Sequence, residues 1–178
     1  MSCSTKLPKT ILSISSVGVV EGRTPAVVGV SWAQSDSAVF VPCAVKIPLG
    51  TRRWQKIRPI YPKVIRFIRE LTLRIGTIEL VLVDITKTNR ISMLGVALAH
   101  FIAGASRCRN LRFIAPSKWL AGMLGPEAKL VIESDSLNVD IIELVYIEYP
   151  HLCEVATSPQ VARAVGLMHY GFHRFCRE

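Results

Sequence analysis

Two histidines, His169 and His173, stand four residues apart, a spacing that lets one face of a helix hold a metal ion. No acidic residue or third ligand stands next to them in the sequence, which favours a plain pair on a helix surface. The cysteines offer no alternative metal site, because they are dispersed singly, form no C-x-x-C pair and make no zinc-binding spacing with the histidines. The five are Cys3, Cys43, Cys108, Cys153 and Cys176. Such a set predicts free thiols in an intracellular, reducing compartment.

A basic stretch that contains one tryptophan is the clearest candidate for binding. Within it, Trp54 is surrounded by four cationic residues: Arg52, Arg53, Lys56 and Arg58. Further cations follow at Lys63, Arg66 and Lys118. These residues could hold a nucleic acid through phosphate contacts while the indole stacks on a base. The alternative is a loop tryptophan that packs on the domain among solvated charges.

The charge of the whole chain points the same way. Lysine and arginine number 22 against 13 acidic residues, a net charge of +9 over 178 residues. Such an excess indicates a partner class, with nucleic acid first, an anionic membrane surface second, and no polyanionic partner as the plain alternative. No apolar stretch approaches the roughly 18–20 residues of a membrane span, so we expect no membrane partner.

The chain begins with a polar tail, residues 1–10, followed by a single domain over residues 11–178. The tail, MSCSTKLPKT, lacks the apolar core of a signal peptide. It is rich in Ser, Thr and Lys and free of acids, which is typical of organellar import segments, although it is short and has no arginine. A mitochondrial or other organellar location is therefore one expectation.

The elements that must position these residues follow from periodicity. Strands are expected over 11–20, 26–33 and 35–47, at the spacing of antiparallel hairpins. A helix follows from residue 58 to its stop at Gly76, then an apolar strand over 78–85 that ends in Asp84. Next come a helix over 90–106 with many small residues and a fifth strand over 110–116. Asp84 could simply cap the turn DITKTN after its strand.

The remaining segments are helical or ambiguous. A short helix is expected to begin with Ser117 as its N-cap and to end at Gly125. Residues 138–149 fit a helix or a strand. Ser158 followed by Pro159 is a strong signal for the start of the last helix. Together these elements predict an α/β domain, a mixed five-stranded sheet of three antiparallel strands followed by β-α-β-α units, with helices on both faces.

This order resembles the RuvC-type Holliday junction resolvases of the ribonuclease H-like superfamily. ILSISSVG is similar to the family's first strand, usually I-x-x-I-D-x-G, and IELVLVDI to its fourth strand, which normally ends in a glutamate. The other similar stretches are VPCAVKIP, ISMLGVALAHFIAGA, LRFIAPSKWLAGMLG and SPQVARAVGLMHY. The resemblance covers roughly residues 10–175 and implies a ribonuclease H-like fold.

The resemblance also implies a site, and here the chain departs from the family. RuvC-type enzymes cut phosphodiesters with two divalent ions held by four carboxylates. The matching positions in this sequence hold Ser15, Asp84, Gln160 and Arg163, so one acid remains. One carboxylate beside an arginine cannot hold two cations. The resemblance therefore predicts a degenerate site with no catalytic residues and no cofactor; a shifted alignment could recruit Asp36, Glu133, Asp135 or Asp140 and, with them, Mg²⁺.

Three functions remain open from the sequence. The leading hypothesis is a catalytically inactive RuvC-like domain that binds RNA or branched DNA, within a ribonucleoprotein such as an organellar ribosome or its assembly machinery. The second is an active, metal-dependent junction resolvase with a displaced site. The third is a protein-interaction module, for instance a homodimer through the helix over 90–106.

Overall fold

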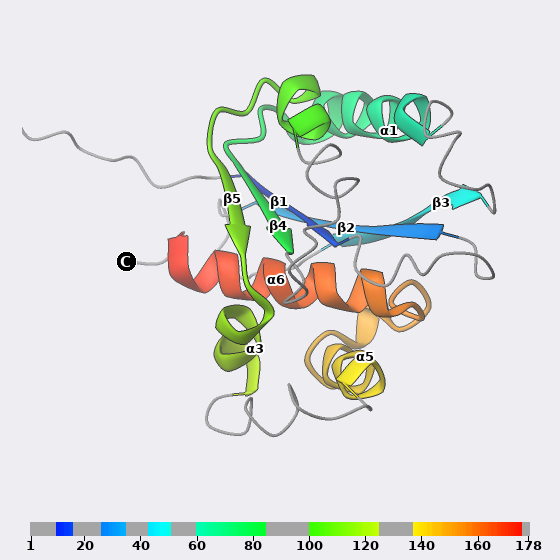
Figure 1. The fold of residues 1–178 in the computed structure, drawn as a ribbon, viewed down its shortest axis with the longest axis vertical. Helices are drawn as coiled ribbons and strands as arrows, with labels where there is room; N and C mark the ends of the chain where they lie inside the picture. The colour runs from blue at the N-terminus through cyan, green and yellow to red at the C-terminus, as the bar shows by residue number, and fades with distance from the viewer. Residues whose placement is uncertain are drawn as a thin grey trace, which may run out of the picture.

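The sheet has five strands in the order β3-β2-β1-β4-β5 (Figure 1). The computed structural model describes residues 10–15, 26–34, 43–50, 60–84, 100–124 and 137–175. β1 (Thr10–Ser15), β2 (Ala26–Gln34) and β3 (Cys43–Gly50) pair antiparallel. β4 (Leu80–Asp84) runs parallel to β1, and β5 (Leu111–Ile114) runs parallel to β4. The predicted mixed sheet is thereby confirmed; residues 35–42 of the expected third strand lie outside the described residues, and β3 runs on to Gly50.

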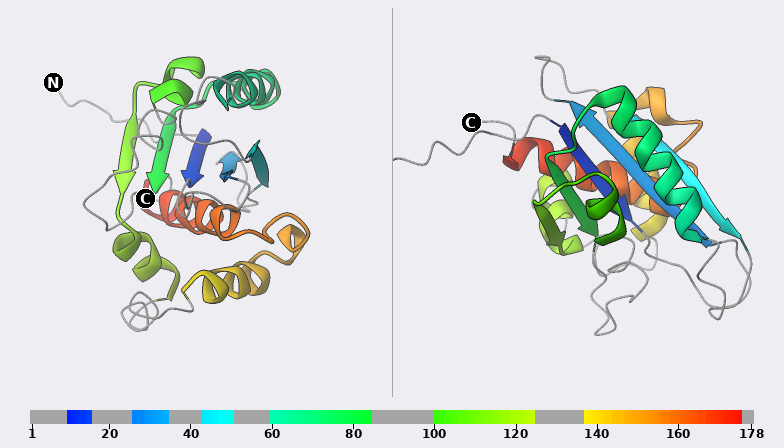
Figure 2. Two further views of the ribbon diagram at one scale, coloured as in Figure 1. Left: turned by 45° about the vertical axis from the view of Figure 1, so that its right-hand side comes forward. Right: turned by 90° about the horizontal axis from the view of Figure 1, so that it is seen from above.

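Helices cover both faces of this sheet. α1 (Ile60–Ile75) and a helical segment over 100–105 lie on one face. α6 (Pro159–Phe175) crosses the other face, and α3 (Pro116–Leu124) and α5 (Leu137–Glu148) pack outside it (Figure 2). Residues 138–149, ambiguous in sequence, are thus mostly helical. No helix among these described residues is long and apolar enough to cross a membrane.

The sequence of β4 is almost wholly apolar because both faces of the strand are buried. Leu80 and Leu82 join the core cluster on the α6 side, while Val81 and Val83 join the cluster on the α1 side. Side chains alternate between the faces of a strand, so a strand covered on both faces needs an apolar residue at every position. Asp84, the last residue of β4, is the exception, and it too is buried.

The helix ends largely follow the predicted signals. α1 stops before Gly76, whose φ of 82° is the left-handed conformation that ends many helices. At the start of α6, the Ser158 hydroxyl lies 3.5 Å from the Val161 backbone nitrogen, and Pro159 is the first helical residue. Ser117 is not an N-cap, because α3 begins one residue earlier, at Pro116.

α6 lies unusually close to the sheet. A Cβ on Gly29 of β2 would stand 2.1 Å from the backbone oxygen of Gln160, and one on Gly171 would stand 2.1 Å from Leu82 Cδ1. Inside this contact the Ser13 hydroxyl donates a hydrogen bond to the Ala164 carbonyl oxygen at 2.6 Å. These contacts fix the rotation of α6 and therefore the direction in which Arg163 points.

Candidate functional site

The site lies where β1 and β4 end. Ile14 pairs with Val83 in the parallel ladder, so the next residues, Ser15 and Asp84, occupy neighbouring strand ends. On its other side, Ser15 pairs with Gly29 of β2. Because the carboxyl ends of parallel strands meet at one edge of a sheet, this edge is where an α/β fold builds its sites.

The Asp84 carboxylate is engaged through both oxygens. Oδ2 accepts a hydrogen bond from Arg163 Nε at 2.8 Å, and Oδ1 accepts one from the Trp119 indole Nε1 at 3.1 Å. The two charged side chains are 4% exposed for Arg163 and 0% exposed for Asp84. The Arg163 guanidinium carbon also lies 5.5 Å from the centre of the Trp119 ring, within cation–π range. The three side chains form one buried polar unit.

Three elements bring these side chains together. β4 ends at Asp84, α3 carries Trp119, and the first turns of α6 carry Arg163. The first turn of α6 also places the backbone of Gln160 directly on Gly29, next to Ser15 in the sheet. The structure therefore gathers the four positions expected from the resemblance at one edge, and the expected proximity of Arg163 to Asp84 is confirmed. Their description as a degenerate catalytic site stays a prediction.

The pair stabilises this arrangement in a way that depends on both partners. Burying an isolated carboxylate or guanidinium costs several kcal/mol, and a close, hydrogen-bonded partner offsets that cost. Removing one partner leaves a buried, uncompensated charge, which typically destabilises a protein by about 3–5 kcal/mol. Asp84 thus acts as a fixed structural anion for Arg163 and Trp119.

The residues present do not fit a pair of divalent cations. Such ions need several oxygen ligands with negative charge, and here the single carboxylate already accepts two hydrogen bonds from a guanidinium and an indole. A cation placed at Asp84 would meet the positive charge of Arg163. Among the residues that the structure describes, no group of three His, Cys, Asp or Glu side chains is placed to hold a metal ion.

The basic residues predicted to bind nucleic acid are only partly placed. Arg52, Arg53, Trp54, Lys56 and Arg58 lie outside the described residues. Lys63 belongs to α1, and Arg66 is exposed on the same helix. Lys118 is exposed on α3, on the opposite side of the sheet. The structure does not bring Arg66 and Lys118 into one patch.

The histidine pair has a structural setting. The rings of His169 and His173 lie 4.4 Å apart on α6, and His169 Nδ1 shares a hydrogen bond with the hydroxyl of the buried Tyr149. Burial, with a smaller contribution from Glu148, raises the pKa of Tyr149, so this hydroxyl keeps its proton and can donate a hydrogen bond to the imidazole nitrogen. This contact joins the end of α5 to α6.

Two members of the site were not predicted from sequence. Trp119 lies within the stretch SKWLAGML, and the requirement that a buried indole N–H find an acceptor could have linked it to a nearby carboxylate. Ser13, two residues before Ser15, gives no such signal, because a serine inside an apolar strand does not say which carbonyl it will bond.

No protein-family model and no curated protein matches this chain. Solved structures, however, are similar to it. The structure of Thermus thermophilus RuvC in complex with a Holliday junction substrate is similar, with a TM-score of 0.58, 11% sequence identity and 94% of each chain covered. A second Thermus thermophilus RuvC structure gives a TM-score of 0.56 at 9% identity, covering 93% of this chain and 95% of that one. The chain therefore has the RuvC-type, ribonuclease H-like fold that the sequence resemblance predicted.

Proposed function

We propose that this chain is a catalytically inactive RuvC-like domain that binds structured nucleic acid. The observation that carries the proposal is the ion pair between Arg163 and Asp84. It places a guanidinium against the only carboxylate that the resemblance assigns to the site. Two-metal cleavage needs cations that activate the nucleophile and stabilise the leaving oxygen, and this arrangement repels them.

Nucleic acid is the partner class best supported by charge and fold. The chain carries a net charge of +9, and one similar structure is a RuvC bound to a Holliday junction. Loss of metal ligands need not remove a basic binding face, since phosphate contacts come from lysine and arginine. We place the domain in a ribonucleoprotein, with an organellar ribosome or its assembly machinery as the setting, because a basic chain and an acid-free tail suit it.

An active enzyme with a displaced site finds less support. Asp36, Glu133 and Asp135 lie outside the described residues. Asp140 belongs to α5, which packs against α6. A homodimer through residues 90–106 stays a prediction.

The test is a salt titration of binding. A labelled four-way DNA junction and a hairpin RNA are titrated with the full chain by fluorescence anisotropy at several salt concentrations. Neutralising Arg52, Arg53 and Lys56 together should flatten the log–log salt slope by about two to three units if all three touch phosphates. Trp54→Ala should weaken binding with little change of slope, by about 1–3 kcal/mol if the indole stacks on a base. If the wild-type chain bound neither nucleic acid, the proposal would be overturned. If the salt slope were unchanged in the triple variant, the basic stretch would not be part of the binding surface.

A further inference from the structure

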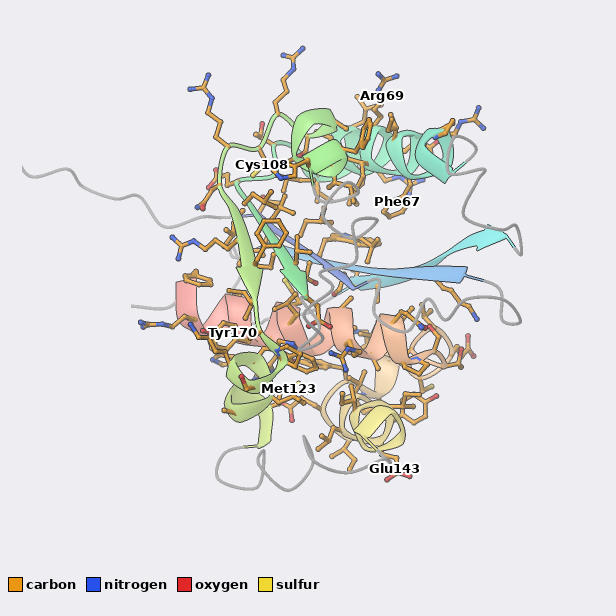
Figure 3. The ribbon with its side chains drawn as sticks, in the orientation of Figure 1. Phe67, Arg69, Cys108, Met123, Glu143 and Tyr170 are labelled. Carbon is orange, nitrogen blue, oxygen red and sulfur yellow. The ribbon has the colours of Figure 1, made fainter. Side chains whose placement is uncertain are left out.

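Charge is divided between the two sides of the sheet. The α1 side carries a set of exposed arginines on α1 and on the turn after segment 100–105: Arg66, Arg69, Arg74, Arg107 and Arg109. On the other side, beyond α6, residues 137–158 contain acidic residues and no lysine or arginine, and the exposed cations there include Lys118 of α3 and Arg174 of α6. An anionic partner is therefore directed to the α1 layer, which stands at the top of Figure 3, where Arg69 is labelled.

A groove of about 370 Å³ lies between α1 and segment 100–105. The described residues that line it are Ile65, Arg69, His100, Phe101, Gly104 and Ala105. Phe101 is 45% exposed, and a Cβ on Gly104 would meet no atom within 4 Å. The His100 ring lies 6.3 Å from the ring of Phe113, another exposed aromatic residue. The described residues of the groove therefore combine an apolar floor, aromatic faces and a cation, and none of them carries a carboxylate.

The residues that line the groove favour an anionic ligand over a second copy of the chain. In a two-fold dimer through the groove, each residue meets its own copy or its neighbours, so Arg69 and the adjacent arginines would face one another. An anionic ligand with flat apolar parts instead matches every lining group, since bases stack on aromatic side chains and phosphates pair with arginine. The volume is near the lower end of small-ligand sites, roughly 300–1,000 Å³.

We propose that this groove binds a single-stranded segment of nucleic acid, with one unstacked base on Phe101 and an adjacent phosphate at Arg69. The inference rests on the proposed function and adds to it a site on the α1 layer, away from the Asp84 edge. Such a site would take a loop, bulge or end rather than a continuous duplex, because only unpaired bases can leave the stack.

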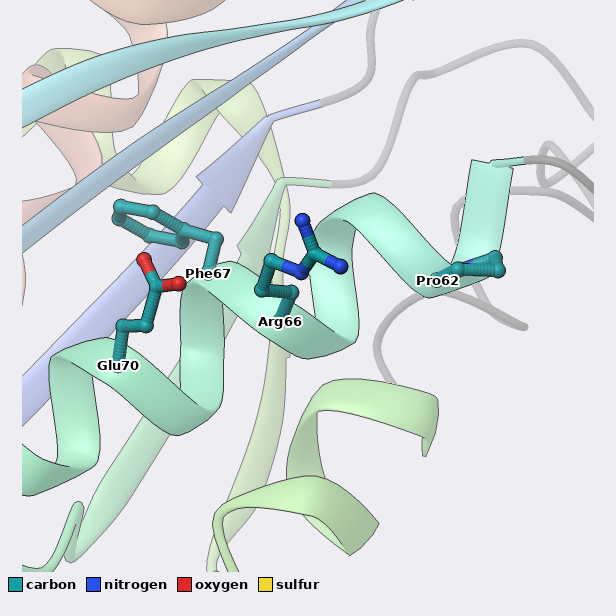
Figure 4. A pocket seen from close by; sticks show the side chains of 4 residues that line it. All are labelled: Pro62, Arg66, Phe67 and Glu70. Atoms are coloured by element: carbon teal, nitrogen blue, oxygen red, sulfur yellow. The ribbon is translucent and has the colours of Figure 1, made fainter.

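A neighbouring hollow on α1 shows what the groove lacks. It measures about 300 Å³ and is lined by Pro62, Arg66, Phe67 and Glu70 (Figure 4). Glu70 adds a carboxylate to the same hollow as Arg66, which disfavours a phosphate. Phe67 is partly buried and its ring packs 5.8 Å from that of Trp32. Among the described residues that line the groove at Phe101, none is acidic.

The experiment compares matched variants of the full chain. Binding of a ten-nucleotide single-stranded RNA, its DNA equivalent and a blunt duplex is measured by fluorescence anisotropy. Phe101→Ala should weaken single-strand binding roughly five- to 150-fold, and Phe101→Trp should retain it. Leu73→Ala removes an apolar side chain that is 87% exposed on α1 and should leave affinity unchanged. Arg69→Ala should weaken binding more than Arg74→Ala does. Ultraviolet cross-links should map to the tryptic peptide 91–107; the RNA and DNA arms show which sugar is preferred.

Several results would overturn this site. One is equal affinity for Phe101→Ala and Leu73→Ala with cross-links elsewhere, which would leave the proposed function intact. Another is a dimeric wild-type chain that Phe101→Ala converts to a monomer without loss of affinity, because the groove would then be a contact between copies. A third is tight binding of an acidic peptide, but not of single strands, at the same residues. If the wild-type chain bound no nucleic acid at all, both this site and the proposed function would be wrong.

Discussion

Asp84 and Arg163, 79 positions apart in sequence, form a buried ion pair of 2.8 Å at the end of β4. The pair joins the sheet to α6 at the edge where the resemblance places metal-binding acids. Its geometry gives Asp84 a structural role that does not require a metal, and the first two predictions depend on that role.

Asp84→Asn should lower the free energy of unfolding by about 3–5 kcal/mol, because it leaves the Arg163 charge buried without a counter-charge. Arg163→Met should cost a similar amount by stranding the carboxylate. The double variant Asp84→Leu with Arg163→Met should lose much less stability than the losses of Asp84→Asn and Arg163→Met added together, since no charge remains buried. Urea denaturation measures all three. Arg174→Ala, an exposed arginine of α6, is the control and should change stability by no more than about 0.5 kcal/mol. An Asp84→Asn protein as stable as wild type would contradict the structural role.

Mg²⁺ and Mn²⁺ should not stabilise the protein specifically. A cation that binds the native state at 100 times its Kd would add about 2.7 kcal/mol to the free energy of unfolding. We expect Tm in either ion to equal Tm in NaCl of matched ionic strength, measured by circular dichroism. A specific rise in Tm that Asp84→Asn abolishes would show that the carboxylate holds a metal.

Gly29→Ala tests how closely α6 packs against β2. The new Cβ would meet the Gln160 carbonyl oxygen at 2.1 Å, so α6 must move away from β2. Overpacking of this kind typically costs about 1–3 kcal/mol, and the clash with rigid backbone favours the upper end. Gly104→Ala is the matched control: its Cβ meets nothing within 4 Å, and alanine in a helix should be neutral or stabilise by up to about 1 kcal/mol. Equal thermal stability of the two variants would refute the close packing.

Cys108 should be less reactive than Cys153 in the native protein. Burial is the main cause that raises the pKa of the Cys108 thiol above its usual value of 9.0, and Cys108 is buried whereas Cys153 is exposed. A raised pKa lowers the thiolate fraction at pH 8, and the thiolate is the form that is alkylated. Because the unfolded chain releases this proton first, the Cys108 contribution should lower stability as pH rises above about 9. Timed iodoacetamide labelling with peptide mass spectrometry measures the two rates, which should converge in urea; equal native rates would contradict the burial of Cys108.

Periodicity was sufficient for most of the fold. The apolar run that ends in Asp84 predicted a strand covered on both faces, and Gly76 and Ser158–Pro159 marked helix ends that the structure confirms. The start of α3 was misplaced by two residues, since an N-cap at Ser117 puts the first helical residue at 118, whereas Pro116 suits a first helical position as well as a strand end. Residues 138–149 could not be assigned because a helix that is apolar on most sides has no stripe to read.

The candidate site was harder to predict from the sequence than the fold was. Its four positions came from a resemblance, and pattern alone could not have joined Asp84 to Arg163 across 79 residues. Trp119 and Ser13 depend on the rotation of α3 and α6, which is set by tertiary contacts such as the close approach at Gly29. The groove at Phe101 likewise exists only once α1 and segment 100–105 lie side by side.

The most direct test of the central claim is to incubate the full chain with a labelled four-way DNA junction in Mg²⁺ and in Mn²⁺ and to analyse the products on native and denaturing gels. The proposed function predicts a salt-sensitive, retarded complex on the native gel and an intact strand on the denaturing gel. Strand cleavage at a defined position near the crossover, lost in Asp84→Asn at a temperature where that variant is folded, would contradict it and establish an active metal-dependent resolvase.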